Sequence, residues 1–315
     1  MGVIIMNILN DFINELNELL EENKLLKDKI FNDENKIKEL ESNLSTFWDG
    51  LTHFYSPFPN ADLIESDPNS LCRNKEYFGI DIREEEQINL MNELSTYFED
   101  YNLKDEKIRY NFQNDYFSNS DALILHAMLK KIKPARLIEV GSGFSSAVTL
   151  DTNEFYLNNN MELTFIEPYP DRLKSLLRQN DYDNVELIES NLQDVSLDFF
   201  KKLNENDILF VDSSHVTKAD SDVNYLIHSI LPNLNKGVYV HFHDIYNRFE
   251  YPLDWIKNGR AWNESYILRA FLEFNDYFEI VLFYNYLLKE HPDKLRFPNY
   301  VSGFEGASFW MKKIK

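Results

Sequence analysis

The stretch RLIEVGSGFSS, residues 136–146, decides the fold of this chain. Its first five residues are mostly apolar, which is typical of a short buried strand. Gly141 and Gly143 follow directly, and a helical pattern begins after them. Two glycines in a strand-to-helix turn let the backbone approach a ligand closely. The stretch therefore predicts the first strand, turn and helix of an open α/β sheet whose turn faces a ligand.

Further apolar runs follow at similar length, and helical stretches separate them. Four of these runs are 162–167, 185–188, 207–212 and 237–243. Strands that alternate with helices predict right-handed crossovers and a parallel sheet. Two more strands, 278–284 and 307–312, follow a helix near 266–274, and we expect a long loop to join them.

The N-terminal region has a different pattern, because residues 6–48 contain no Gly or Pro. A heptad places apolar residues at ten of twelve a and d positions. The a positions are 9, 16, 23, 30, 37 and 44, and the d positions are 12, 19, 26, 33, 40 and 47. Asn23 at an a position can fix register, whereas Asp33 at a d position weakens the seam. We expect a coiled-coil helix over 1–48 that forms a homo-oligomer, the alternative being a long helix that lies on its own domain.

Between the coiled coil and the sheet, residues 49–133 have the pattern of an irregular helical linker or cap. Gly50 and two prolines end the first helix, because proline cannot continue it. Residues 84–101 and 121–131 have helical spacing, and Ser120 or Asp121 is the expected N-cap of the second. The expected organisation is therefore 1–48, 49–133 and 134–315, with the ligand-binding domain last.

Composition excludes several classes of function. The formal net charge is −21, so the chain repels phosphate backbones, and we expect no nucleic-acid partner. Cys72 is the single cysteine, which rules out a disulfide within one chain and suits a reducing compartment. No uncharged apolar run approaches the roughly 20 residues that span a bilayer, so we expect no membrane span and a cytoplasmic protein.

Ligands of open α/β sheets bind beyond the carboxyl ends of the strands. The second strand ends at Glu167, where a carboxylate can accept both hydroxyls of a ribose. A dinucleotide site would place a third glycine three residues after Gly143, but that position is Ser146. The pattern therefore favours a nucleoside cofactor other than a dinucleotide.

The fourth strand ends in Asp212-Ser-Ser-His215, and the fifth ends in His243-Asp244. Adjacent parallel strands lie about 4.8 Å apart, so these side chains should meet at one edge of the sheet. Carboxylates with water can hold Mg²⁺, and a histidine can act as a general base near neutral pH. Alternatively, both aspartates only orient the cofactor amine and the helix ends.

The Glu139-x-Gly141-x-Gly143 turn, Glu167 and the order of elements together resemble the class I S-adenosylmethionine-dependent methyltransferases over residues 134–315. The resemblance implies a Rossmann-like, seven-stranded, mostly parallel sheet with a C-terminal antiparallel strand pair. It also implies that the turn residues line the methionine part of S-adenosylmethionine and that Glu167 binds its ribose. Segment 189–194, which ends in Asp194, would flank the adenine. Ser145 stands where the family often has another glycine.

The two later motifs resemble the metal-dependent sugar O-methyltransferases, within a wider group that includes cephalosporin-hydroxylase-like proteins. The resemblance implies catalytic roles for Asp212 and His215, with His215 as the base, and binding of the cofactor by Asp212 as well. It further implies a divalent metal, Mg or Mn, on Asp212, His243 and Asp244. His243 departs from the carboxylate common in that group, and imidazole suits Mn²⁺ better than Mg²⁺.

The sequence thus predicts an enzyme that methylates a hydroxyl of a saccharide or another polar small molecule, in glycan modification or natural-product assembly. Segment 246–264 is aromatic and polar, so it either contacts this acceptor or packs in the core. Two alternatives stay open. One is an NAD(P)-dependent oxidoreductase on a similar sheet, and the other is a coiled-coil scaffold with a non-catalytic cofactor domain.

Overall fold

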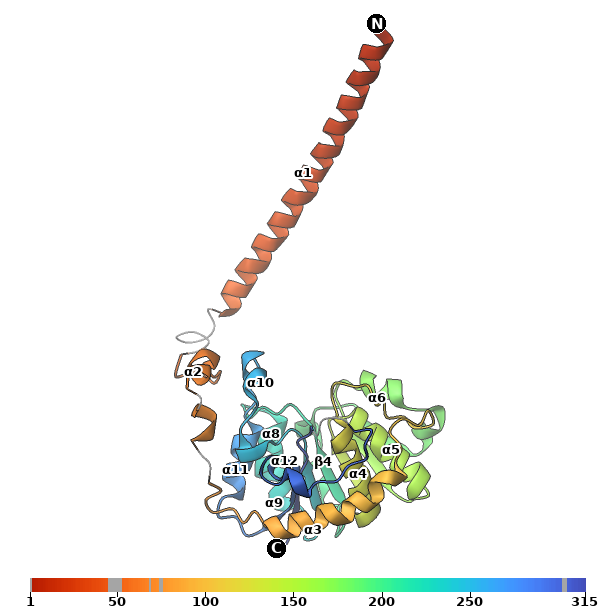
Figure 1. Ribbon diagram of the computed structural model, residues 1–315, viewed down its shortest axis with the longest axis vertical. Coiled ribbons are helices and arrows are strands. Elements are labelled where there is room, and N and C mark those ends of the chain that lie inside the picture. Colours follow the sequence, from red (N-terminus) through yellow and green to blue (C-terminus); the bar gives the residue numbers. More distant parts are fainter. Residues whose placement is uncertain (1, 45–52, 68, 74–75, 302–304) are drawn as a thin grey trace. The chain divides into compact units, whose positions relative to one another are not determined.

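The computed structural model describes residues 2–44, 53–67, 69–73, 76–301 and 305–315, and the chain divides into two compact units, Met1–Ala61 and Asp62–Lys315 (Figure 1). The first unit contains one long helix, α1 (Gly2–Leu44). The expected helix is therefore confirmed over this range, while residues 45–48 lie outside the described residues.

Every side chain between residues 15 and 42 of α1 is exposed. The seam positions among them include Leu16, Leu19, Leu26, Ile30, Ile37 and Leu40, each at least 44% exposed. Leu25, at a c position, is 69% exposed as well. An isolated helix gains nothing from a run of exposed leucines, whereas a coiled coil buries them. The pairing of α1 with another copy stays a prediction.

The second unit is built on a seven-stranded sheet in the order β3-β2-β1-β4-β5-β7-β6. The strands are β1 (Arg136–Val140), β2 (Glu162–Ile166), β3 (Val185–Ile188), β4 (Ile208–Val211), β5 (Tyr239–Phe242), β6 (Phe278–Phe283) and β7 (Phe309–Lys313). Neighbours are parallel except that β7 runs antiparallel to both β5 and β6. The expected Rossmann-like sheet with its antiparallel pair is confirmed. The order reverses between β1 and β4, which is the switch point where such sheets bind ligands.

Helices that precede the sheet and helices that connect its strands complete the hydrophobic core of the second unit. The longer ones are α3 (Glu84–Leu94), α4 (Asn119–Ile132), α5 (Phe144–Tyr156), α11 (Glu264–Leu272) and α12 (Tyr284–Glu290). The short ones are α2 (Ala61–Ser66), α6 (Asp171–Leu176), α7 (Leu197–Phe200), α8 (Asp222–Tyr225), α9 (Leu231–Asn233) and α10 (Leu253–Lys257). α4 packs against α5 and α3 against β6, so residues 77–132 contribute to the same hydrophobic core as the sheet.

Three local expectations were wrong. The N-cap of α4 is Ser118, whose Oγ accepts the N–H of Asp121 at 3.1 Å, while Ser120 and Asp121 are buried inside the helix. The pattern over 84–101 breaks at Leu94 and continues as a 3-10 helix over Ser95–Asp100. The connection between β6 and β7 contains α12 and is not only a loop, because an apolar run that looked like one long strand turns into a helix at Tyr284.

None of the helices in the described ranges combines the length and the apolar character that crossing a bilayer requires.

The exposed seam of α1 predicts self-association of the full chain. Leu26→Asn at a d position should raise the dissociation constant of the oligomer by roughly tenfold or more, because losing a buried leucine costs about 1.5–3 kcal/mol per chain. Leu25→Asn is the matched control, since it makes the same change off the seam. Light scattering over a dilution series measures both. Equal behaviour of the two variants would rule out the seam as the contact.

Candidate functional site

The backbone of the turn between β1 and α5 lies directly against the backbone that follows β4. Gly141 has φ +78°, and a Cβ there would lie 1.8 Å from the carbonyl oxygen of Asp212. Its N–H donates to the carbonyl of Ile166 at the end of β2 (3.0 Å). Only glycine can therefore occupy this position, and the turn meets the ends of three strands.

Gly143 and Ser146 finish the turn differently from a dinucleotide site. Gly143 is extended, with φ 170°, and its N–H donates to the side chain of Ser146 at 3.0 Å. A Cβ at Gly143 would lie 3.0 Å from Cδ of Arg172, a flexible side chain. Ser146 thus closes the turn with its own hydroxyl, where a dinucleotide site would have a glycine that seats the helix.

Glu139 lies beneath this turn with no exposed surface. Ser145 Oγ donates to its Oε1 at 2.5 Å, while Oε2 is buried without a hydrogen-bond partner among the described residues. Burial raises the pKa of Glu139 to about 8. A buried oxygen without a donor is costly, so this atom fits a ligand that brings a cationic or N–H donor to it.

Two backbone N–H groups hold the carboxylate of Glu167 in place. Its carboxylate accepts the N–H of Ser142 at 3.1 Å and the N–H of Tyr169 at 2.8 Å. Each carboxylate oxygen has a further lone pair, so Glu167 can still accept ligand hydroxyls.

Two hollows adjoin at this edge, of about 290 and 450 Å³. They share Glu167 and the segment 212–214 in their walls. Segment 191–193 lines the larger one, whereas Asp194 does not line either. Asp194 is exposed and accepts a bond from the side chain of Asn191 at 3.1 Å. The walls therefore include Gly141, Gly143, Glu167 and Asp212, whereas Glu139 lies buried beneath them and Asp194 lies outside them.

The ends of β4 and β5 bring two carboxylates and two imidazoles together. His215 Nε2 lies 3.4 Å from Asp212 Oδ1 and 3.7 Å from Asp244 Oδ2. His243 Nδ1 lies 3.4 Å and 3.6 Å from the same two oxygens. Both histidines are almost fully buried. Two ring nitrogens therefore converge on the same pair of carboxylate oxygens.

A second carboxylate holds each imidazole from behind. Glu264, at the start of α11, accepts from Nδ1 of His215 at 2.9 Å. Asp121, in α4, accepts from Nε2 of His243 at 3.3 Å. Asp121 also accepts the N–H and the hydroxyl of Ser308 in front of β7, at 3.1 and 2.6 Å. The outer carboxylates fix the ring orientation, so each histidine presents its other nitrogen to the centre.

The backbone at this cluster is strained. His215 and Asp244 have φ of 58° and 59°, in the left-handed region that residues with a Cβ seldom adopt. The N–H groups of Asn263 and Glu264 donate to the carbonyl of His215 at 3.0 and 3.1 Å, which holds its conformation. Such strain persists where surrounding structure enforces it, and it is common at functional sites.

The side chains of this cluster strongly shift one another's pKa values. Burial by itself would lower the pKa of His215, but hydrogen bonds to Asp212 and Glu264 raise it to about 10. The pKa of His243 is also raised, since Asp244 and Asp212 outweigh its burial. Burial acts to raise the pKa of Asp212, but the two imidazoles lower it. The described side chains of the cluster thus form a network of ion pairs.

The same atoms can hold a metal. One ligand atom each from Asp212, His215 and Asp244 lies within 4.8 Å of the other two. His243, the expected nitrogen ligand, points Nδ1 at both carboxylates, and this buried atom makes no hydrogen bond in the described part of the chain. Carboxylates mixed with imidazoles suit Mn²⁺, Fe²⁺ or Zn²⁺ better than Mg²⁺. The donor chemistry therefore fits a divalent transition metal.

Sequence reasoning missed several residues of the site. Tyr116 and Phe117, which come before α4, line the smaller hollow, and Phe117 lies 4.9 Å from the ring of His243. Arg172 lies over the ring of Tyr116 at 3.8 Å. Glu264 and Asp121 lie 49 and 122 residues from the histidines that they hold. No local pattern could signal contacts over such separations.

A family model described as a methyltransferase domain matches residues 138–245. An uncharacterised protein from Archaeoglobus fulgidus is 37% identical to this chain over an alignment of 164 residues, and the match covers 49% of this chain and 73% of that protein.

Solved structures show a likeness of fold at low identity. The O-methyltransferase TomG from Streptomyces achromogenes, in complex with SAM, matches with a TM-score of 0.41 and 13% identity over 71% of this chain and 89% of TomG. CmcI with Mg and SAM matches with a TM-score of 0.38 and 17% identity, over 63% of this chain and 72% of CmcI. The methyltransferase PaMTH1 from Podospora anserina, bound to SAH, matches with a TM-score of 0.41 and 17% identity, over 81% of this chain and 95% of PaMTH1.

The buried Glu139 predicts a specific pH dependence of stability. Its pKa is about 8 when folded and 4.5 in its ordinary state, so the folded chain keeps a proton that the unfolded chain loses. This group's contribution to the free energy of unfolding therefore falls as pH rises from 4.5 to 8. Glu139→Gln cannot ionise and should gain stability relative to the native chain across that window.

Urea denaturation at several pH values measures this difference. Glu205→Gln, at an exposed position, is the control and should show a constant difference. A pH-independent difference for Glu139→Gln would show that Glu139 is ionised in the folded protein.

Proposed function

Because this chain belongs to the class I S-adenosylmethionine-dependent methyltransferase family, we propose that it transfers the methyl group to a hydroxyl of a saccharide or another polar small molecule. The observation that supports O-methylation is the buried His215–Glu264 pair beside the cofactor hollow, since a hydroxyl must lose its proton during transfer.

The cofactor edge suits S-adenosylmethionine in three places. Oε2 of Glu139 has no donor among the residues that the structure describes, which favours the ammonium group of the methionine part. Glu167 retains lone pairs for the ribose hydroxyls. The hollow lined by 191–193 supplies a place for the adenine. Ser146 in the turn counts against the nicotinamide alternative, because its hydroxyl fills the corner where a pyrophosphate-binding helix is seated.

Methyl transfer is an in-line displacement at carbon. The acceptor oxygen forms a bond to the methyl group as the carbon–sulfur bond breaks, the sulfur keeps that electron pair, and S-adenosylhomocysteine leaves. The acceptor proton passes to Nε2 of His215, which faces the site while Nδ1 is held by Glu264. The carboxylate of Glu264 fixes the tautomer and stabilises the imidazolium that forms. Holding donor and acceptor in line supplies much of the remaining rate acceleration.

A divalent metal is the second part of the proposal. Asp212 and Asp244 would hold it, with His243 as the nitrogen ligand and Asp121 fixing that ring. When bound, such a cation lowers the pKa of the acceptor hydroxyl. Asp212 and Asp244, two of the groups that raise the pKa of His215, are the same residues that would hold the cation, so the pKa of His215 would be lower in the metal-bound chain.

The scaffold alternative makes the cofactor domain non-catalytic. A decayed site would not need strained backbone at His215 and Asp244, nor a buried carboxylate behind each histidine. We therefore propose that the cofactor domain is catalytic and acts on a small molecule. The role proposed for α1 is to join copies of the chain.

His215→Asn should lower kcat by about 10²–10⁴, the usual contribution of a general base. Binding of S-adenosylhomocysteine should change little, because the side chain lies on the acceptor side of the hollow. Formation of S-adenosylhomocysteine, measured by mass spectrometry with a saccharide panel as acceptors, gives the rate. Glu264→Gln should lower kcat less and alter its pH profile, as expected of a positioning residue. Full activity of both variants would refute the base.

Metal binding is testable without turnover. Free Mn²⁺ gives a paramagnetic resonance signal that disappears on binding, so titration of the protein gives its affinity. Asp244→Asn should weaken Mn²⁺ binding by at least about tenfold, because a charged ligand becomes neutral. The exposed Asp198→Asn is the control. Equal affinity in Asp244→Asn, or no binding by the native chain, would remove the metal from the mechanism.

A further inference from the structure

One arginine of the smaller hollow has no acidic partner. Arg172, in the first turn of α6, lines this hollow together with His215. Its guanidinium group forms no ion pair and donates no hydrogen bond within the described part of the chain, whereas the nearby Arg178 pairs with Glu154 at 3.4 Å. The sequence has 53 acidic and 32 basic residues, so acidic partners are plentiful. The guanidinium group of Arg172 is therefore available to a ligand.

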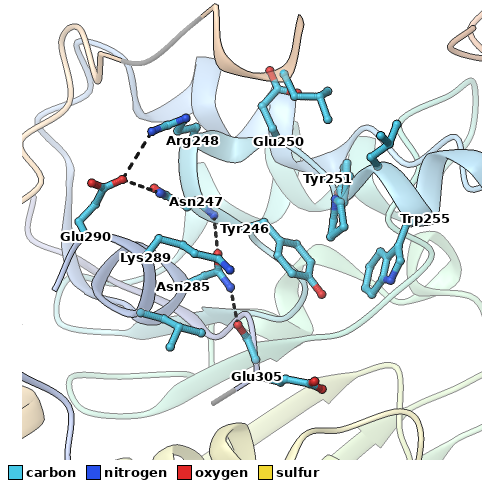
Figure 2. A pocket seen from close by; sticks show the side chains of 15 residues that line it. Tyr246, Asn247, Arg248, Glu250, Tyr251, Trp255, Asn285, Lys289, Glu290 and Glu305 are labelled. Atoms are coloured by element: carbon cyan, nitrogen blue, oxygen red, sulfur yellow. Dashed lines mark hydrogen bonds and ion pairs between the residues drawn. The ribbon is translucent and has the colours of Figure 1, made fainter. Parts of the chain in front are cut away.

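A cavity outside the site shows the more usual arrangement. It has a volume of about 730 Å³ and shares no lining residue with the hollow that contains His215. In this cavity Arg248 lies 3.7 Å from the carboxylate of Glu290, and Asn247 donates to the same carboxylate at 2.9 Å (Figure 2). The charge of Arg248 is thus partly neutralised by a neighbour, whereas the charge of Arg172 is not.

An aromatic ring and a glycine hold the side chain of Arg172 over the cofactor turn. Its guanidinium carbon lies 3.8 Å from the centre of the Tyr116 ring, which in turn stacks on the ring of Phe144 at 6.0 Å. A Cβ at Gly143 would lie 3.0 Å from Cδ of Arg172, so the glycine leaves room for the arginine to cross the turn. A cation–π contact uses no N–H group, so the guanidinium group can still donate to a ligand.

The other charged side chains around this hollow are mostly negative. Three carboxylates line it, those of Glu167, Asp212 and Asp244. Glu139 lies buried beneath the turn, where it suits the ammonium group of the methionine part. The carboxylate group of that same part would be repelled by these side chains. Among the described lining residues Arg172 is the only lysine or arginine, so it alone supplies the complementary charge.

We propose that Arg172 binds the carboxylate group of the methionine part, and that Tyr116 holds the guanidinium group in position for this contact. The inference rests on the proposed methyl transfer and adds to it a residue that selects a donor with a free carboxylate. A bond between guanidinium and carboxylate is stronger than one between neutral groups. Tyr116 comes before α4, so the region before the sheet contributes to donor binding as well.

Isothermal titration of the full chain with two ligands tests this proposal. S-adenosylhomocysteine has the carboxylate group, whereas its decarboxylated form, S-adenosyl-3-thiopropylamine, keeps the ammonium group and lacks the carboxylate. The native chain should bind S-adenosylhomocysteine at least about tenfold more tightly. Arg172→Gln should make the two affinities nearly equal. Arg178→Gln is the matched control and should keep the preference, because it removes the same charge from an arginine that lines neither hollow.

Two variants of Tyr116 test the role of its ring. Tyr116→Leu removes the ring and should reduce the preference for S-adenosylhomocysteine by about threefold, because an exposed cation–π contact is weak. Tyr116→Phe keeps the ring and should retain the native preference. Equal behaviour of the two variants would overturn the role of Tyr116.

The two ligands also separate this inference from the proposed function. If the native chain binds both equally, the inference is overturned while binding of the cofactor stands. The same holds if Arg172→Gln keeps the preference, or if Arg178→Gln loses it to the same extent. If the native chain binds neither ligand, the proposed function fails and the inference about Arg172 fails with it.

Discussion

The close backbone contact between Gly141 and Asp212 is the constraint on which the site depends. A Cβ at Gly141 would lie 1.8 Å from the carbonyl oxygen of Asp212, so only a glycine with positive φ lets the first turn meet the end of β4. The contact falls where the strand order reverses between β1 and β4. This contact brings the turn between β1 and α5 close to the carboxylate–histidine cluster at the ends of β4 and β5. A methyl donor bound at the turn could then meet an acceptor at the cluster.

The second physical feature is the shared negative charge of the cluster. Asp212 and Asp244 face two imidazoles, and each imidazole has a further carboxylate behind it. Burying so many ionisable groups is unfavourable unless they pair or bind a cation. The chain accepts strained backbone at His215 and Asp244 to assemble this arrangement. The buried ionisable groups and the strained backbone both reduce stability, which indicates that the cluster serves a function.

The sequence predicted the features whose signals are local. The strand, the two glycines and the carboxylates at strand ends lie within short stretches, and the parallel sheet brings them together with no further information. Asp121 and Glu264 could not be found in this way, because each contacts its histidine across 122 and 49 residues. The region before the sheet was expected to be a linker or cap, and within it Phe117 packs on His243 and α4 supplies Asp121. Segment 246–264 was expected at the acceptor side or in the core, and its aromatic rings form a wall between two cavities.

Isothermal titration of the purified chain with S-adenosylhomocysteine, in parallel with NADH, tests the central claim most directly. The account predicts micromolar binding of S-adenosylhomocysteine, strongly weakened in Gly141→Ala, and no comparable binding of NADH. Tight binding of NADH with none of S-adenosylhomocysteine would contradict the account and return the sheet to the oxidoreductase alternative.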